Sequence, residues 1–330
     1  MTGGRPVNYR LTWLLRRDRQ RYWALDALAA EVGLGLAQLH GELAEIERQG
    51  FVLDHHPLYG VRLDGVPPVI DRDEIMFAMA SGRLGRTVRV YEQTASTNDL
   101  ALRAAASPSS DGLVIVAERQ TAGRGRRGSR WFDAAGKGLL VSVVHWAMAG
   151  PDIAGDLMLA TSVAVCRAVE PLVGRSPQIK WPNDIEFQRR KAAGILVESA
   201  AAGDADARRP FVIGIGLNVN HQERDFPTDI ASRATSLRLE AGGTVDRCVV
   251  LADVLTALRD ALESLQGPER QGLRSAYDAR SDMVGRNVTL SEAGQTFAGT
   301  VEAISPHYAL VLRLQNGHLR SFDASRVRLL

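Results

Sequence analysis

Apolar residues recur at helical spacing through the first fifty residues of the chain. Three stripes follow one another: Leu11, Leu14 and Leu15, then Leu25, Leu28, Ala29 and Val32, and then Leu36, Leu39, Leu43 and Ile46. Gly50 ends this helical pattern. Residues 51–53 and 60–63 flank a polar loop at 54–57 and predict a two-stranded hairpin. This order of elements is typical of a winged helix-turn-helix over residues 1–66.

Apolar runs of strand length and of helix length are mixed along residues 67–280. The strand candidates are 113–117, 139–146, 179–181, 194–197 and 211–219, and the helix candidates are 154–173 and 249–265. Because strands and helices do not alternate strictly, an α+β fold is favoured over a doubly wound sheet. Pro67 and Pro68 disfavour both a continued helix and a central strand, so they mark the linker before this segment.

The last fifty residues carry short alternating runs instead. Their apolar positions are Val288, Leu290, Val301, Ile304, Leu310, Val311 and Leu314. Asn316-Gly317 predicts a two-residue hairpin turn, because both residues can take a positive φ. Several short strands separated by turns indicate a small SH3-like barrel over residues 281–330. The chain is therefore expected to comprise three domains: 1–66, 67–280 and 281–330.

The composition supports a folded protein and excludes little else. The 330 residues are 45% hydrophobic and 24% charged, and the net charge is only +2, so no global charge points to nucleic acid or to a membrane. Cys166 and Cys248 lie in apolar helical patterns, which indicates reduced core cysteines. No apolar run reaches the roughly 20 residues of a membrane span. We therefore expect a soluble, cytoplasmic protein with no membrane partner.

The segment from Gln120 to Trp131 combines three glycines with four arginines. The glycines satisfy G-x-G-x-x-G, but they run into a loop and a strand instead of a helix, so a dinucleotide-binding turn is rejected. The arginines are Arg124, Arg126, Arg127 and Arg130. Because they repel one another, the loop should be mobile when empty and be ordered by an anion. A solvated basic loop or a nucleic-acid patch are the alternatives at this point.

Other segments place polar residues beside small ones. They are Ser96-Thr97-Asn98-Asp99, Lys180-Trp181-Pro182-Asn183-Asp184, Lys191 to Glu198, and Gly214 to Asn220. Glycines inside strand patterns permit the close approach of a ligand or of another backbone. Taken alone, Lys191 is more typical of a surface lysine, and Ser96 of a helix N-cap. No phosphate-loop, serine-nucleophile or zinc spacing is present, so no fixed metal site is expected.

Taken together and in this order, these motifs resemble the biotin–protein ligase family. The similarity covers residues 88–220, and the three-part layout resembles the bifunctional bacterial members, which also act as biotin-sensing repressors. The resemblance implies a central mixed sheet of the class II synthetase-like type, with biotin, ATP and Mg²⁺ as ligands. It also implies a biotin carboxyl carrier protein, a subunit of acetyl-CoA carboxylase, as the acceptor. Operator DNA and a homodimer are compatible with it.

The resemblance also implies roles for individual residues. The biotin-site residues are Ser96, Thr97, Asn98, Gln120, Arg124, Gly125, Arg126, Lys191, Gly194, Gly214 and Gly216. The adenylate contacts are Arg124, Arg126, Trp131, Asn183 and Asn218, with Asn220 as a further polar candidate. Arg126 and Lys191, together with Mg²⁺, would offset charge when the biotin carboxylate attacks the α-phosphate of ATP. Asp184 would orient or deprotonate the acceptor lysine in the transfer step.

Two features depart from the family pattern. Where the family commonly has Ser-Pro after the tryptophan, this chain has Asp133-Ala134, which predicts a local change in the loop. The N-terminal unit has eight arginines against eight acids, and its third helix is acidic, unlike most DNA-binding surfaces. If the unit binds DNA, Arg16 and Arg17 are expected to contact phosphates, and Gln38 a base.

Two rival functions stay open. One is a ligand-sensing transcription factor without transferase activity, which would not need the full cationic set. The other is a lipoate or octanoyl transferase of the same superfamily, against which the arginine–glycine loop argues.

Overall fold

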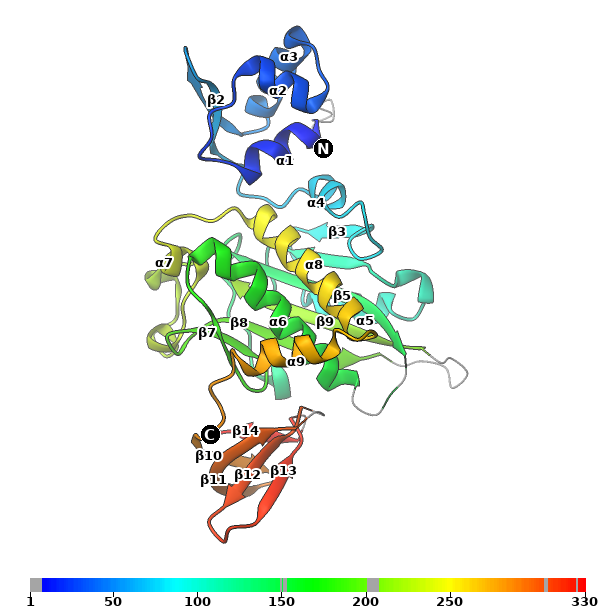
Figure 1. The fold of residues 1–330 in the computed structure, drawn as a ribbon, viewed down its shortest axis with the longest axis vertical. Helices are drawn as coiled ribbons and strands as arrows, with labels where there is room; N and C mark the ends of the chain where they lie inside the picture. The colour runs from blue at the N-terminus through cyan, green and yellow to red at the C-terminus, as the bar shows by residue number, and fades with distance from the viewer. Residues whose placement is uncertain (1–7, 149, 151–152, 201–207, 306–307, 325) are drawn as a thin grey trace.

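The computed structural model describes residues 8–148, 150, 153–200, 208–305, 308–324 and 326–330. Along the longest axis the chain forms three parts in succession: a helical N-terminal unit, a central sheet covered by helices, and a C-terminal unit of strands (Figure 1). Among the described residues, no helix combines the length and the apolar composition that crossing a bilayer requires. Cys166 and Cys248 are buried and free, as predicted.

The N-terminal unit contains the predicted helices and hairpin in the predicted order. These elements are α1 (Tyr9–Arg17), α2 (Leu25–Val32), α3 (Leu36–Arg48), β1 (Val52–His56) and β2 (Gly60–Gly65). Leu39, Leu43 and Ile46 of α3 lie in an apolar core that this unit does not share with the rest of the chain. Leu36 is an exception to the predicted stripe: it stands in the first turn of α3 and is 50% exposed.

The hairpin is longer than the sequence pattern indicates. His55 and His56 belong to β1 and not to the loop, because the two strands stay paired as far as His56 and Gly60. The turn is thereby reduced to residues 57–59.

A seven-stranded mixed sheet forms the central part. Its order is β3-β4-β5-β9-β8-β7-β6, in which only β3 and β4 run parallel. The bounds are β3 (Val88–Tyr91), β4 (Val114–Ala117), β5 (Gly138–Met148), β6 (Gln178–Lys180), β7 (Asp184–Phe187), β8 (Arg190–Ser199) and β9 (Arg208–Asn218). The central part is thus α+β, as expected, with a mixed sheet and no doubly wound topology.

Helices pack on both faces of this sheet. They are α4 (Arg72–Ala78), α5 (Thr97–Ala104), α6 (Ile153–Val173), α7 (Leu237–Ala241), α8 (Arg247–Ser264) and α9 (Arg270–Asp278). Val143 and Ile213 share a core with α6 and α8, whereas their neighbours Val144 and Val212 share another with α5. Because successive strand residues point to opposite faces, α5 lies on the face opposite α6 and α8. The α5 face is the one that carries the site described below.

The C-terminal part is a five-stranded antiparallel sheet in the order β13-β12-β11-β10-β14. Its strands are β10 (Asn287–Glu292), β11 (Gln295–Ile304), β12 (Leu310–Leu314), β13 (Leu319–Phe322) and β14 (Val327–Leu329). The predicted turn is in place but is not a two-residue turn. Leu314 bonds to His318 across three residues, and of the predicted pair only Gly317 has a positive φ, of 81°.

The C-terminal sheet is joined to the central part. Its apolar residues continue the core that contains α6 and α8. The Trp181 indole donates a hydrogen bond to the carbonyl of Tyr308 at 3.0 Å, and the Tyr308 hydroxyl donates to the carbonyl of Pro182 at 2.6 Å. Two exchanged hydrogen bonds therefore fix this sheet beside the motif at residues 180–184.

The N-terminal unit is also tied to the central part, through a buried ion cluster. Arg16 of α1 donates to Glu74 of α4 at 2.8 Å and to Asp246, the N-cap of α8, at 2.6 Å. All three side chains are at least 94% buried. The expectation that Arg16 contacts DNA phosphates is therefore wrong, because its guanidinium faces the protein. Arg17 is half-exposed but pairs with Asp253 of α8.

Candidate functional site

Side chains from three adjacent strands form the floor of a cavity of about 1100 Å³. Two rows run across β8, β9 and β5: Gly194, Gly216 and Leu140 form one, and Leu196, Gly214 and Ser142 form the next. The alternate residues, such as Ile195 and Ile215, point into the core on the other face. The G-x-G motif and the glycine of the lysine motif are thus cross-strand neighbours.

Two side chains explain why these positions are glycines. A Cβ on Gly216 would lie 2.6 Å from the Trp131 ring, and one on Gly194 would lie 2.9 Å from it. A Cβ on Gly214 would overlap the Asn98 amide. The predicted close approach is therefore real, and the approaching groups in this structure are Trp131 and Asn98.

Uncharged hydrogen-bonding groups gather at the α5 end of the cavity. The Gln120 carbonyl oxygen accepts from the Thr97 backbone N–H at 2.7 Å and from the Thr97 hydroxyl at 3.0 Å. The Ser142 hydroxyl lies 2.8 Å from the Thr97 hydroxyl and 2.5 Å from the Asn98 carbonyl oxygen. Ser96 is the N-cap residue of α5, as predicted, although its side chain makes no capping bond. Gln120 instead satisfies the first N–H of the helix.

Cationic groups lie along the other side of the same cavity. The ammonium of Lys191 is 2.6 Å from the Asp184 carboxylate and 5.5 Å from the centre of the Trp131 ring. A bulge explains how Lys191 reaches this face. Ile185 pairs with Ala193 but Glu186 pairs with Lys191, so Ala192 is an extra residue. The bulge therefore turns Lys191 to the same side as Gly194.

The arginine–glycine loop lines the cavity and is stabilised by internal backbone hydrogen bonds. Gly125 donates to the Ser129 carbonyl at 2.7 Å, and the Trp131 N–H donates to the Gly123 carbonyl at 3.0 Å. The turn at residues 126–128 is a short 3₁₀ helix and no α-helix follows it, which agrees with the rejection of a dinucleotide fold. Arg127 takes a left-handed φ of 55°.

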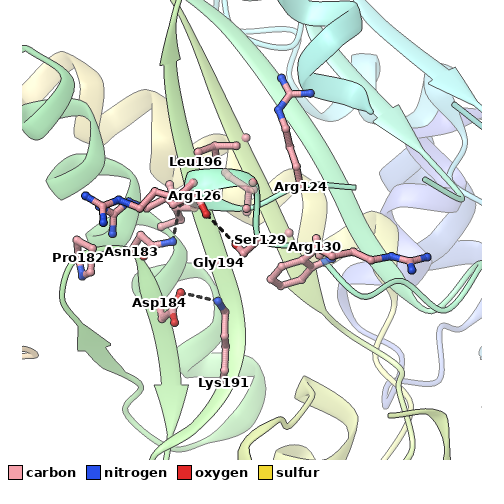
Figure 2. Close-up of a pocket in the computed structure, with 18 of the residues that line it drawn as sticks. Arg124, Arg126, Ser129, Arg130, Pro182, Asn183, Asp184, Lys191, Gly194 and Leu196 are labelled. Atoms are coloured by element: carbon pink, nitrogen blue, oxygen red, sulfur yellow. Dashed lines mark hydrogen bonds and ion pairs between the residues drawn. The ribbon is translucent and has the colours of Figure 1, made fainter. Parts of the chain in front are cut away.

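The loop arginines do not converge on one point in this structure. Arg124 pairs with Asp99 and Glu198, and Arg126 donates to the carbonyl of Ala324 in the C-terminal part. Figure 2 shows the side chains of Arg124 and Arg130 pointing away from the Lys191–Asp184 pair. The mutual repulsion expected from the sequence is thus offset in part by acids. Burial lowers the pKa of Arg126 from its usual range.

The cavity brings together most of the residues singled out from the sequence. They are Ser96, Thr97, Asn98, Gln120, Arg124, Gly125, Arg126, Trp131, Asn183, Asp184, Lys191, Gly194, Gly214 and Gly216. Asn218 and Asn220 do not line it. Asn218 is buried behind Lys191 and donates to the carbonyl of Thr235 at 3.0 Å, while the amide of Asn220 bonds both backbone groups of Val245. Ligand contact through either asparagine therefore stays a prediction.

Several residues near the site were not predicted from the sequence. Glu198 accepts hydrogen bonds from both Asn98, at 2.6 Å, and Arg124, and so joins α5 to the arginine–glycine loop. Arg233 and residues 327–330 line the cavity from distant parts of the chain. The period-2 alternation of β8 could have placed Glu198 on the face of Gly194 and Leu196. No local signal marks the others.

Known proteins are similar to this chain in sequence and in fold. The sequence pattern of the biotin/lipoate A/B protein ligase family matches residues 90–219. A biotin–[acetyl-CoA-carboxylase] ligase of Mycobacterium tuberculosis is 35% identical over 253 residues, which are 74% of this chain and 90% of that protein. The bifunctional ligase/repressor BirA of Bacillus subtilis is 29% identical over 286 residues, 86% of each chain.

A solved structure of a biotin protein ligase also resembles the fold of this chain. The biotin protein ligase from Aquifex aeolicus in complex with biotin and ATP matches with a TM-score of 0.63 and 25% identity, over 74% of this chain and 99% of that one. The chain belongs to the biotin/lipoate A/B protein ligase family. Within this family it is similar to the bacterial biotin protein ligases.

Proposed function

We propose that this chain is a biotin–protein ligase. It forms biotinyl-5′-AMP from biotin and ATP and then transfers biotin to a lysine of a biotin carboxyl carrier protein. One observation carries the proposal: a single sheet face holds uncharged hydrogen-bonding groups at one end and Lys191, with the arginine loop, at the other. An uncharged heterocycle with an acidic tail suits these two ends. Because the reaction consumes ATP, we place it in the cytoplasm.

The α5 end of the cavity is our proposed biotin pocket. The ureido ring offers two N–H donors and one carbonyl acceptor, and the hydroxyl and amide groups of Thr97, Asn98 and Gln120 can match both kinds of group. Trp131 lies over Gly194 and Gly216, so its indole forms an apolar wall of the cavity. Because the ureido ring is uncharged, these uncharged side chains are sufficient to bind it.

Charge governs the first chemical step. A biotin carboxylate oxygen attacks the α-phosphorus of ATP, the new C–O–P linkage forms, and pyrophosphate leaves. Lys191 and Arg126 would lower the barrier by offsetting the negative charge that concentrates on the phosphate oxygens. Asn183 and Trp131 line the same region and are proposed adenylate contacts. Arg124 would have to exchange its present acidic partners for the ligand.

The described residues contain no cluster of three carboxylate, histidine or cysteine side chains that could hold a metal ion. We propose that Mg²⁺ enters with the phosphates of ATP. Asp184, which pairs with Lys191, is a carboxylate of the cavity lining. When bound, Mg²⁺ adds further positive charge at the phosphates.

The second step transfers the acyl group. The acceptor amine attacks the biotinyl carbonyl, a C–N bond forms, and the C–O bond to AMP breaks. The amine must be neutral to attack, and it loses a proton in the process. Asp184 remains our candidate to orient it, but its carboxylate is paired with Lys191 in the structure. That pair must open before Asp184 can take the proton.

A carrier-labelling assay tests the function. The protein is incubated with biotin, ATP, Mg²⁺ and an isolated carrier domain, and the mass of the carrier is measured by mass spectrometry. We expect one biotinyl group on the carrier, and none when ATP is omitted. Labelling with lipoate in place of biotin, or labelling that needs no ATP, would instead support the lipoate or octanoyl transferase alternative. No labelling would support a sensor without transferase activity.

We further propose that residues 1–66 form a winged helix-turn-helix, followed by a ligase domain over 67–280 and an SH3-like barrel over 281–330. The order of α1, α2, α3 and the β1–β2 hairpin supports the first assignment. Operator DNA is the proposed partner, because relatives named as bifunctional repressors match 86% of the chain. A homodimer would fit a palindromic operator.

Two acidic residues of α3 have side-chain partners within this unit. Glu45 is buried and pairs with Arg48, and Glu47 lies 3.1 Å from a ring nitrogen of His55. Gln38 is exposed in the first turn of α3, so it stays our candidate for a base contact. A titration against DNA upstream of the protein's own biotin genes, with biotinyl-AMP present, should show binding that Gln38→Ala weakens. Binding no tighter than to unrelated DNA would refute the repressor proposal.

A further inference from the structure

Asp133 connects the two ends of the arginine–glycine loop. Its Oδ2 accepts a hydrogen bond from the Gln120 backbone N–H at 2.9 Å. The other links between the ends are backbone bonds, from Trp131 to Gly123 at 3.0 Å and from Gly136 to the carbonyl of Glu118 at 3.1 Å. Among the described residues, Asp133 thus supplies the side-chain link between the segments that enter and leave the loop.

The residue held by Asp133 is the one that orients the polar end of the cavity. The Gln120 side chain accepts two hydrogen bonds from Thr97, and the hydroxyl of Thr97 in turn bonds to Ser142. The Gln120 backbone sets where its side chain can reach. Loss of the Asp133 bond would therefore move Gln120, and with it the oxygen that Thr97 donates to.

The surroundings of Asp133 are unfavourable for a carboxylate, so a purely structural role would not explain its presence. Its Oδ1 is buried and has no hydrogen-bond partner among the described residues. Burial raises the pKa of the carboxyl, and the charged groups around it are Arg119, Glu118 and Arg247. A carboxylate with one unsatisfied buried oxygen normally destabilises a fold. Its presence calls for a compensating role at the bond that its other oxygen makes.

We propose that Asp133 is a positioning residue for the biotin pocket, which acts by fixing the Gln120 backbone through the 2.9 Å bond between its Oδ2 and the Gln120 N–H. The inference rests on the proposed function. It assigns Asp133 to the recognition of the biotin ring and not to the phosphate chemistry, because Gln120 and Thr97 belong to the uncharged end of the cavity. Asp133 itself touches no reacting atom.

Two variants separate the hydrogen bond from the charge. Asp133→Ala removes the acceptor, whereas Asp133→Asn keeps a carbonyl oxygen of the same reach and removes the ionisable group. We expect Asp133→Ala to raise the KM for biotin about tenfold or more, the effect of losing a hydrogen bond to a charged group. The KM for ATP should stay within about twofold. Asp133→Asn should recover part of this loss, with a KM for biotin between those of Asp133→Ala and the wild type, because a neutral carbonyl is a weaker acceptor than a carboxylate.

The pH profile supplies a readout that a structural role would not move. An ionised carboxylate is the stronger acceptor, so in the wild type the KM for biotin should rise as the pH falls through the raised pKa of Asp133. In Asp133→Asn this rise should be absent. An unchanged KM for biotin in Asp133→Ala, an equal rise in both KM values, or no rescue by asparagine would each overturn the proposal.

Amide hydrogen exchange separates this inference from the proposed function. In the free protein, with no biotin present, the Gln120 N–H should exchange faster in Asp133→Ala than in the wild type and Asp133→Asn. This result does not depend on which ligand the cavity binds. If the carrier assay fails while the exchange difference is present, the function is wrong and the Asp133 link is right. Equal exchange in all three proteins would refute the link.

Discussion

At the residue scale, the cavity depends on glycines at facing positions of two strands and on one lysine of β8. Gly194, Gly214 and Gly216 leave room for Trp131 and Asn98. Lys191 shares their face only because Ala192 is bulged out of the β7–β8 register. The position of one cation in the site is thus set by one extra residue in a strand, which is a common device beside active sites.

Lys191→Ala should slow formation of biotinyl-AMP by roughly 10²–10³-fold, the usual loss when one preorganised electrostatic donor is removed. A single-turnover measurement of adenylate formation gives this rate. Arg270→Ala serves as the matched control, because Arg270 is an exposed cation paired with Asp156 and does not line the cavity. A Lys191→Ala rate within about threefold of the wild type would show that Lys191 is an ordinary surface lysine.

At the element scale, the loops at the rim of the cavity are attached by few, identifiable contacts. The arginine–glycine loop is anchored by Arg124 at one end and by Asp133 at the other. A second loop follows β9, where Phe226 stacks on His221 with ring centres 5.3 Å apart. Phe132 lies 6.2 Å from both rings, so the two loops share an aromatic cluster.

Residues 123–130 should be cleaved by trypsin more slowly when biotinyl-AMP is bound. The ligand supplies an anion to which the arginines can turn, and a conformation that binds the ligand better becomes more populated. The cleavage rates at Arg124 to Arg130 are measured with and without biotinyl-AMP, with cleavage at Arg313, which is exposed and does not line the cavity, as the internal reference. Equal rates in the loop under both conditions would contradict ordering by the ligand.

His221 should make the protein less stable in acid. The ring is 1% exposed, its nitrogens have no hydrogen-bond partner among the described residues, and burial lowers its pKa to about 4. Because the unfolded chain binds the proton near pH 6.5 and the folded chain does not, stability is lost as the pH falls between these values. Asp225 and Lys137 are the charged groups that face it.

Urea unfolding of the wild type and His221→Phe at pH 8 and pH 5 tests this expectation. Phenylalanine keeps the stack on Phe226 and cannot be protonated. The wild type should lose about 2 kcal/mol more than the variant between these pH values, from the pKa difference. The same loss in both proteins would show that another group controls the acid sensitivity.

At the scale of the whole molecule, buried polar contacts join the three parts, and the central and C-terminal parts also share an apolar core. Trp181 and Tyr308 attach the C-terminal sheet, and Arg126 reaches across the cavity to the carbonyl of Ala324. Arg16 attaches the N-terminal unit to α4 and α8. The site is therefore assembled from the central sheet and the C-terminal part, and the C-terminal part lies at the end of the molecule opposite the N-terminal unit (Figure 1).

Arg16→Ala should lower the free energy of unfolding by about 3–5 kcal/mol, since it leaves the carboxylates of Glu74 and Asp246 buried without their cation. Arg17→Ala is the matched control: its pair with Asp253 is half-exposed, so its loss should cost at most about 1 kcal/mol. Chemical denaturation of both variants gives the comparison. Similar losses in the two variants would mean that the Arg16 cluster does not hold the unit in place.

The sequence by itself determined the local elements and the chemistry of the site. The period of the apolar residues predicted α1 to α3, α6, α8 and the main strands, because burial of one face imposes that period on any chain. The order of motifs from Ser96 to Asn218 indicated the ligase family, and the glycines indicated close packing against their strands. These are signals carried by neighbouring residues, so they need no knowledge of the fold.

Only the tertiary structure decided which of those residues meet. Arg16 looked like a phosphate contact and is a buried link between two parts, because Glu74 and Asp246 lie 58 and 230 residues away along the chain. Asn218 of the G-x-G-x-Asn motif does not line the cavity and donates a hydrogen bond to the carbonyl of Thr235. Burial and ion pairing depend on groups that are distant in sequence, and a local pattern of residues does not record them.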